Sequence, residues 1–110
     1  MITLFRRREL PPTRLFWLDD AGDPVSFSSG TWTWSVRIEQ DLVETTLSGV
    51  TVAINANPTT YTASSSDVPS LTLSFAAGSL DNVSVGPGTL IVVGTSSGLD
   101  REGRFEVVVR

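Results

Sequence analysis

Hydrophobic and polar residues alternate strictly in three segments of the chain. In the segment 32–39, WTWSVRIE, every second side chain is apolar. The segments 50–55 (VTVAIN) and 70–76 (SLTLSFA) repeat this period. A period of two places the apolar side chains on one face of an extended strand. We therefore predict three strands, each with one buried face.

Four further segments predict strands by composition. The segments 88–94 (GTLIVVG) and 104–110 (RFEVVVR) are almost continuously apolar and rich in β-branched residues. This composition is typical of a hairpin near the centre of a sheet. The segments 2–7 (ITLFRR) and 13–18 (TRLFWL) complete a predicted set of seven strands.

The connections between these segments favour a β-sandwich. Turn signals recur at the spacing typical of sandwiches, and the strongest helical candidate is a single turn at 79–82 that Ser79 would cap. A length of 110 residues suits one domain, 1–110. We predict an all-β fold, an Ig-like antiparallel β-sandwich of about seven strands, in preference to a small barrel. The residues expected in its core are Trp34, Val36, Ile38, Val52, Ile54, Leu73, Phe75, Val92, Phe105 and Val107.

The acidic segment 19–24, DDAGDP, raises the question of a metal site. Glycine can adopt the left-handed conformation that closes a short loop, and aspartate readily accepts hydrogen bonds from nearby backbone amides. A calcium loop is the alternative, but the D-x-[DN]-x-[DN]-G spacing with a later glutamate is absent. Carboxylates on an exposed loop also lack the burial that separates the pKa values of a catalytic pair. We therefore predict a turn made by Asp19, Asp20, Gly22, Asp23 and Pro24.

Composition excludes several classes of function. The chain has no cysteine and no histidine, and all eight of its basic residues are arginine. Thiolate and imidazole chemistry are impossible, so we expect no enzyme, no catalytic residues, no metal and no cofactor. The formal charge of −4 disfavours nucleic acid as a partner. The chain also lacks a run of about 20 apolar residues and the order of a signal peptide, so we expect no membrane span.

Two groups of residues are candidates for binding. Arg6, Arg7 and Arg8 form a basic cluster in an acidic chain, which predicts either a contact with an acidic protein or a solvated strand end. Three tryptophans could form a platform for sugar rings, but two of them share a strand face with apolar residues, which favours core packing. These tryptophans are Trp17, Trp32 and Trp34.

Two long segments resemble a known family. The segments 13–38 (TRLFWLDDAGDPVSFSSGTWTWSVRI) and 86–110 (GPGTLIVVGTSSGLDREGRFEVVVR) resemble the small Ig-like domain at the N-terminus of tailed-phage upper baseplate proteins and of related small tail proteins. The shared plan is an apolar strand, a D-x-x-G-x-P turn, a glycine step, an alternating strand and a closing G-T hairpin. The matching residues are Asp19, Gly22, Pro24, Gly30 and Gly88, while Leu90 departs from the plan where an aromatic residue is common.

This resemblance implies a structural component of a bacteriophage virion, in the tail, tail tip or baseplate. Such a protein is made in the host cytoplasm and is present in many copies, bound to other virion structural proteins. Because the sequence ends at Arg110 without a receptor-binding extension, we expect an adaptor. The alternatives are a carbohydrate-binding or adhesion module of Ig-like fold and a capsid decoration protein.

Overall fold

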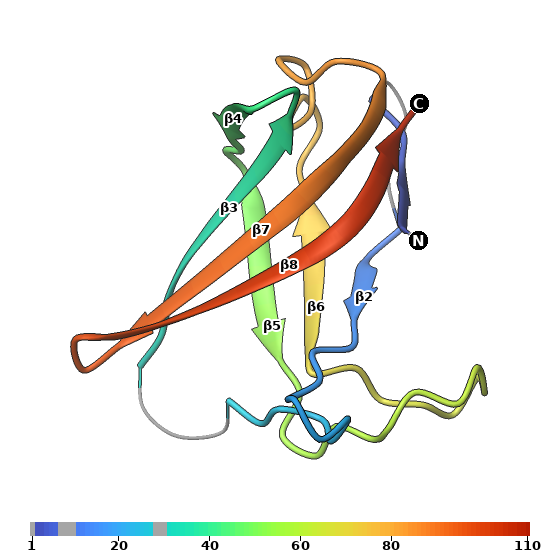
Figure 1. Ribbon diagram of the computed structural model, residues 1–110, viewed down its shortest axis with the longest axis vertical. Coiled ribbons are helices and arrows are strands. Elements are labelled where there is room, and N and C mark those ends of the chain that lie inside the picture. The colour runs from blue at the N-terminus through green and yellow to red at the C-terminus, as the bar shows by residue number, and fades with distance from the viewer. Residues whose placement is uncertain (1, 7–10, 28–30) are drawn as a thin grey trace.

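The computed structural model describes residues 2–6, 11–27 and 31–110, and these residues form eight β-strands and no helix (Figure 1). Three residues named above, Arg7, Arg8 and Gly30, lie outside the described residues. Within the described ranges, no helix is long and apolar enough to cross a membrane. The strands are β1 (Ile2–Leu4), β2 (Thr13–Leu15), β3 (Thr33–Gln40), β4 (Val43–Thr46), β5 (Val50–Ile54), β6 (Leu71–Phe75), β7 (Gly86–Ser96) and β8 (Leu99–Val109).

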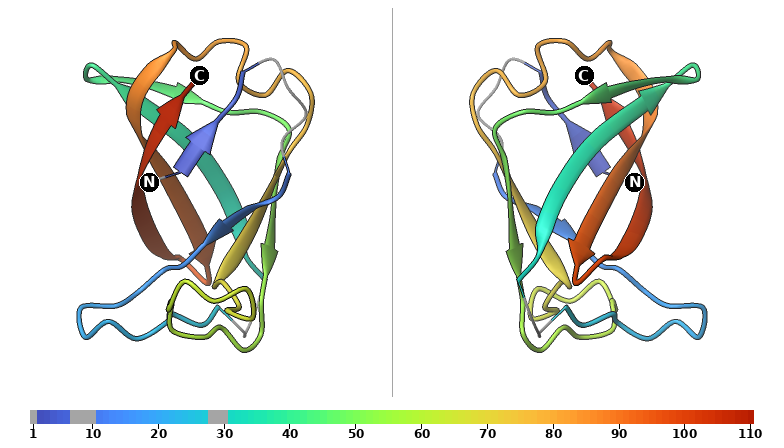
Figure 2. Two further views of the ribbon diagram at one scale, coloured as in Figure 1. Left: turned by 90° about the vertical axis from the view of Figure 1, so that its right-hand side faces the viewer. Right: turned by 90° about the vertical axis from the view of Figure 1, so that its left-hand side faces the viewer.

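The strands form two sheets that face each other, as the side views in Figure 2 show. The larger sheet has the order β1-β8-β7-β3-β4 and the smaller one the order β2-β6-β5. This arrangement confirms the predicted all-β sandwich. One pairing departs from the antiparallel prediction, because β1 runs parallel to β8, with Ile2 opposite Val107 and Leu4 opposite Val109. After β1 the chain crosses to the smaller sheet and forms β2, so β1 has no hairpin partner.

The strand boundaries differ from the prediction at both sheets. The alternation had not indicated β4, which lies at an edge and exposes three of its four side chains. Strands β7 and β8 are longer than predicted, because their hairpin extends through polar residues beyond the smaller sheet. Strands β1 and β2 are shorter than predicted and end at Leu4 and Leu15.

The segment 79–82 forms successive turns in place of a helical turn. The Ser79 hydroxyl donates to the Ala76 carbonyl at 2.7 Å, and the Asp81 amide donates to the Gly78 carbonyl at 3.2 Å. Ser79 therefore closes a turn and does not cap a helix.

The core lies between the two sheets. Val36 of β3 faces Val92 of β7, and Ile38 faces Leu90, so alternate side chains of the larger sheet point inward. Of the ten residues expected in the core, five are buried: Val36, Ile38, Leu73, Val92 and Val107. The other five are half-buried and packed against that core: Trp34, Val52, Ile54, Phe75 and Phe105. The core also contains residues outside the predicted list, among them Leu4, Phe27, Leu80 and Val83.

Candidate interaction surfaces

The acidic segment 19–24 forms a compact turn held by Asp19. Its Oδ1 accepts hydrogen bonds from the amides of Ala21 and Asp23, both at 2.9 Å. Gly22 has a φ of +84° and donates its amide to the Asp19 carbonyl at 2.9 Å. Leu18 bridges to Pro24 across the base of the turn, while Asp20 points to solvent. The described residues contain no group of three acidic side chains that could hold a metal ion.

The three tryptophans belong to an aromatic cluster built around Phe27. The Phe27 ring meets Trp17, Trp32 and Trp34 edge to face, with centroid distances of 4.9, 5.3 and 5.4 Å. Trp32 stacks on Trp34 at 5.5 Å, and its Nε1 donates to the Phe27 carbonyl at 3.1 Å. All three indoles are half-buried and packed against the core. The cluster therefore closes one end of the sandwich.

Two glycines of the central hairpin provide the space for these rings. A Cβ at Gly94 would lie 2.5 Å from the ring of Trp34, its partner across the β3–β7 ladder. A Cβ at Gly103 would lie 2.9 Å from the ring of Trp17. Both indoles therefore lie directly against glycine backbone, where a larger residue would not fit.

The predicted basic cluster is visible only at Arg6. Its Nη2 donates to the Asp81 carbonyl at 3.1 Å, and its amide donates to the Arg110 carbonyl at 3.0 Å. Arg6 Nε is buried and has no hydrogen-bond partner among the described residues. Arg6 therefore fastens the N-terminal segment to the turns after β6. Since Arg7 and Arg8 lie outside the described residues, their role as an interface stays a prediction.

The polar loop between β5 and β6 is organised by the buried carboxylate of Asp67. It accepts hydrogen bonds from the amides of Thr62 and Ser64, at 2.8 and 3.0 Å, and from the Thr62 hydroxyl. The hydrogen bond from the Thr62 amide is the largest influence on the pKa of Asp67, which lies below its ordinary value of 3.8. A guanidinium nitrogen of Arg14 donates to the Asp67 carbonyl. These hydrogen bonds to one carboxylate hold the loop together.

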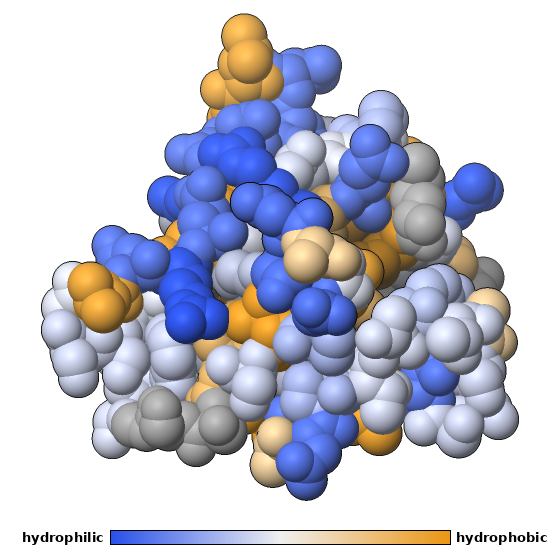
Figure 3. Space-filling view, turned by 60° about the horizontal axis from the view of Figure 1, so that its bottom comes forward, coloured by the Kyte–Doolittle hydropathy of each residue, from blue (hydrophilic) through white to orange (hydrophobic). Residues whose placement is uncertain are grey.

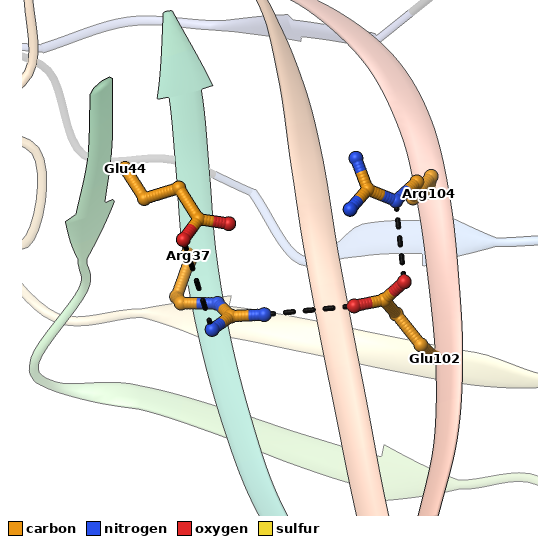
Figure 4. A network of polar contacts seen from close by, with 4 residues as sticks. All are labelled: Arg37, Glu44, Glu102 and Arg104. Carbon is orange, nitrogen blue, oxygen red and sulfur yellow. Dashed lines mark hydrogen bonds and ion pairs between the residues drawn. The ribbon is translucent and has the colours of Figure 1, made fainter. Parts of the chain in front are cut away.

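The outer face of the larger sheet carries a network of ion pairs (Figure 4). Glu102 lies 3.2 Å from Arg104 and 3.6 Å from Arg37, measured between charged atoms, and Arg37 lies 4.0 Å from Glu44. Ile91 of β7 pairs with Arg37 of β3 on one side and with Arg104 of β8 on the other. Its side chain is fully buried although it does not belong to the core cluster. We attribute its burial to the aliphatic parts of the flanking arginines. All four charged side chains remain partly exposed, so each pair adds at most about 1 kcal/mol, and the face is a solvated one.

An apolar tip lies at the opposite end of the sandwich from the aromatic cluster. We define it by Leu42, Val43 and Val85, which are 93%, 65% and 65% exposed. The β3–β4 turn consists of Asp41 and Leu42, with φ values of +49° and +66°. Glycine, asparagine and aspartate are the residues that normally occupy such positions, and leucine is unfavourable there.

A hollow beside the apolar tip separates the β3–β4 turn from the turn before β7. It encloses about 330 Å³ and is lined by residues of both turns, among them Val43 and Val85. Gln40 connects the two turns, since its side chain donates to the Ser84 carbonyl at 2.8 Å and accepts from the Ser84 amide at 3.2 Å. Sequence reasoning missed this site. The available signal was the leucine of the segment EQDLVE, placed where a hairpin turns.

Other apolar groups on the surface are small and separated. Figure 3 shows the end of the molecule opposite the tip brought forward, and its hydrophobic atoms are interrupted by hydrophilic ones. Outside the tip, the exposed large apolar side chains of the described residues are Leu18, Tyr61 and Leu99, the last of which is 73% exposed beside the β7–β8 turn. Scattered residues of this kind are normal on a soluble domain and indicate no partner. Comparison with known protein families, curated proteins and solved structures finds no match for this chain.

Proposed function

We propose that this protein is a structural component of a bacteriophage virion, an adaptor of the tail, tail tip or baseplate that works through protein–protein interfaces. The observation that carries the proposal is the apolar tip, where Leu42 is exposed on a strained turn. The resemblance of segments 13–38 and 86–110 to small phage tail domains supplies the biological setting.

The tip is energetically unfavourable for a protein that acts alone. A non-glycine residue in the left-handed region costs about 1–3 kcal/mol where the surroundings do not relieve it. An exposed leucine gains nothing in return, whereas a neighbour that buries it fully recovers about 1.5–3 kcal/mol. A neighbouring subunit that covers Leu42 therefore explains both its conformation and its exposure.

The location of the tip suits an adaptor. Leu42 lies at the end of a two-stranded projection, β3–β4, and the hollow beside it is bordered by Val43 and Val85. A side chain of a neighbouring subunit can fill the hollow while Leu42 fills a pocket of that subunit. Interlocking side chains of this kind exclude water from a shape-complementary interface. The basic cluster at Arg6, Arg7 and Arg8 remains a second candidate contact, with an acidic partner.

Incorporation into particles tests this role. Leu42→Asn introduces a residue that tolerates the left-handed conformation and removes the apolar group. The variant should fold with unchanged or higher stability, while its amount in purified particles falls. Leu99→Asn, at the exposed end of the other hairpin, is the matched control and should be incorporated normally.

The outcomes are measured by quantitative mass spectrometry of particles purified from a lysate of the phage that carries the gene. Absence of the wild-type chain from these particles would refute the virion role. Normal incorporation of Leu42→Asn would show that the apolar tip is not the docking surface. Replacing Arg7 and Arg8 with serine tests the second contact in the same assay, with Arg6 kept because it fastens the N-terminal segment.

A further inference from the structure

Strand β5 differs from the other strands at the sheet edges. The edge strands are β1 and β4 in the larger sheet and β2 and β5 in the smaller one. Three of them have three or four residues, and charged residues or prolines lie in or beside them: Arg6 after β1, Glu44 in β4, and Pro12 and Arg14 at β2. Short length, charge and proline are the usual means of preventing edge-to-edge association. Strand β5 has five residues, VTVAI, and none of these protections.

The absence of charge extends well beyond β5. From Thr45 to Leu80 the only charged residue is Asp67, which is buried within its own loop. Four charged residues of the larger sheet lie instead on its outer face, in the network of Arg37, Glu44, Glu102 and Arg104. The whole chain has a formal charge of −4, so two copies repel each other least where they meet through an uncharged surface. Strand β5 provides such a surface, with the low charge typical of interface centres.

The backbone of β5 is ready to pair on its open side. Gly49 accepts from Ala76 and Asn55 donates to Ser70, so the odd-numbered residues of β5 direct their backbone groups toward β6. The even-numbered residues Val50, Val52 and Ile54 therefore direct theirs away from β6. These outward groups have no partner among the described residues. The side chains of the same three residues are half-buried and packed against the core.

We propose that β5 pairs antiparallel with β5 of a second copy, around a two-fold axis at Val52. In this register Val52 faces Val52 of the second copy, and Val50 faces Ile54, each pair exchanging two backbone hydrogen bonds. The apolar row on the inner face continues across the interface. On the outer face, Thr51 of one copy lies opposite Ala53 of the other. The sequence VTVAI is self-complementary in this register, as a two-fold interface requires, and it joins the two smaller sheets into one.

The proposed virion role would gain one partner from this pairing, a second copy of the chain. Dimer formation is nevertheless measured on the purified chain alone. The interface is small, so dimers of the 11.8 kDa chain should form with rising concentration between about 1 µM and 1 mM. Sedimentation velocity measures this change. A chain that stays monomeric to about 1 mM refutes the pairing and leaves the virion role standing. Absence of the chain from purified particles would refute the virion role and leave the β5 pairing standing.

Two matched variants test the register. Thr51→Lys/Ala53→Lys places like charges directly opposite each other at two cross-strand pairs, so the dimer dissociation constant should rise about 10-fold. Thr51→Glu/Ala53→Lys places opposite charges there and should keep or strengthen the dimer. Both positions are exposed in the monomer, and urea unfolding at low concentration should show that both variants fold. If both variants dimerise like wild type, β5 is not the interface.

Cross-linking gives an independent readout, because the wild-type chain has no cysteine. Thr51→Cys/Ala53→Cys should form a covalent dimer under mild oxidation, since residues 51 and 53 of the two copies form non-hydrogen-bonded pairs with close Cβ atoms. Thr46→Cys, exposed on edge strand β4 and outside the apolar tip, is the control and should remain monomeric. Efficient cross-linking of the control in place of the β5 variant would overturn the proposal.

Discussion

Gly94→Ala should destabilise the protein because residue 94 supports the indole of Trp34. The Cβ of an alanine would lie 2.5 Å from Cζ3 and 2.8 Å from Cη2 of that ring. The ring has little room to retreat, since Trp32 stacks on it at 5.5 Å and Phe27 meets it at 5.4 Å. The added methyl group must therefore displace several packed aromatic rings together.

The expected magnitude follows from two opposing effects. Overpacking a well-packed site costs about 1–3 kcal/mol. Alanine restricts the unfolded chain more than glycine does, which returns about 0.5–1 kcal/mol. The net loss in unfolding free energy should be about 1–2 kcal/mol. For a domain of this size such a loss lowers Tm by at least about 4 °C.

A double-mutant cycle assigns the loss to Trp34. Urea unfolding followed by circular dichroism gives the free energies of wild type, Gly94→Ala, Trp34→Leu and the double variant. In the Trp34→Leu background the ring is gone, so Gly94→Ala should be neutral or slightly stabilising, with a coupling energy of about 1–3 kcal/mol. A neutral Gly94→Ala in the wild-type background, or equal losses in both backgrounds, would refute this account of the contact.

Three further outcomes follow from the structure. Gly22→Val should lower the free energy of unfolding by about 1–2 kcal/mol through backbone conformation alone, because φ is +84° and no atom lies within 4 Å of the added Cβ. Asparagine tolerates this conformation, so Gly22→Asn should retain most of the wild-type stability in urea unfolding. Leu73 is buried, so Leu73→Ala should lower the free energy of unfolding by about 2–5 kcal/mol. Phe75 is half-buried, so Phe75→Ala should lower it by less than the roughly 3–5 kcal/mol lost at a fully buried phenylalanine. A larger loss for Phe75→Ala than for Leu73→Ala in urea unfolding would contradict the observed burial. The depressed pKa of Asp67 contributes stability that is complete above its ordinary value of 3.8 and is lost as the pH falls through the folded-state pKa. Asp67→Asn should therefore be less stable than wild type at neutral pH, and the difference should shrink below about pH 4; a difference independent of pH in unfolding experiments would contradict it.

The alternating pattern predicted the inward faces of β3, β5 and β6 but not the edge strand β4. Val36 and Ile38 are buried as expected because one face of β3 is apolar and the other is polar along the length of the strand. Strand β4 escaped notice because its residues are mostly exposed, so no apolar period marks it. The parallel pairing of β1 with β8 joins residues at opposite ends of the sequence, and no local pattern reports such a pairing.

The surfaces were harder to predict than the core. Phe27 organises the aromatic cluster from an irregular segment, where periodicity gives no information. The apolar tip depends on the conformation of Asp41 and Leu42, and the sequence shows a leucine without showing its left-handed backbone. The acidic turn was easier, since the aspartate, glycine and proline at 19–24 each have a local conformational preference that does not depend on distant residues.

The parallel ladder between β1 and β8 constrains the order in which the chain can fold during synthesis. Leu4 is fully buried, its carbonyl accepts from the amide of Arg110, and its strand partner is Val109. The ribosome releases Leu4 long before it produces those partners, so β1 must wait, unpaired, until the last residues of β8 emerge. Until then β8 has no neighbour on its β1 side, and Leu4 is exposed to any chaperone or neighbouring chain. Closure of this ladder is therefore expected to be the last step of folding, and substitutions in β1 should accelerate unfolding more than they slow folding.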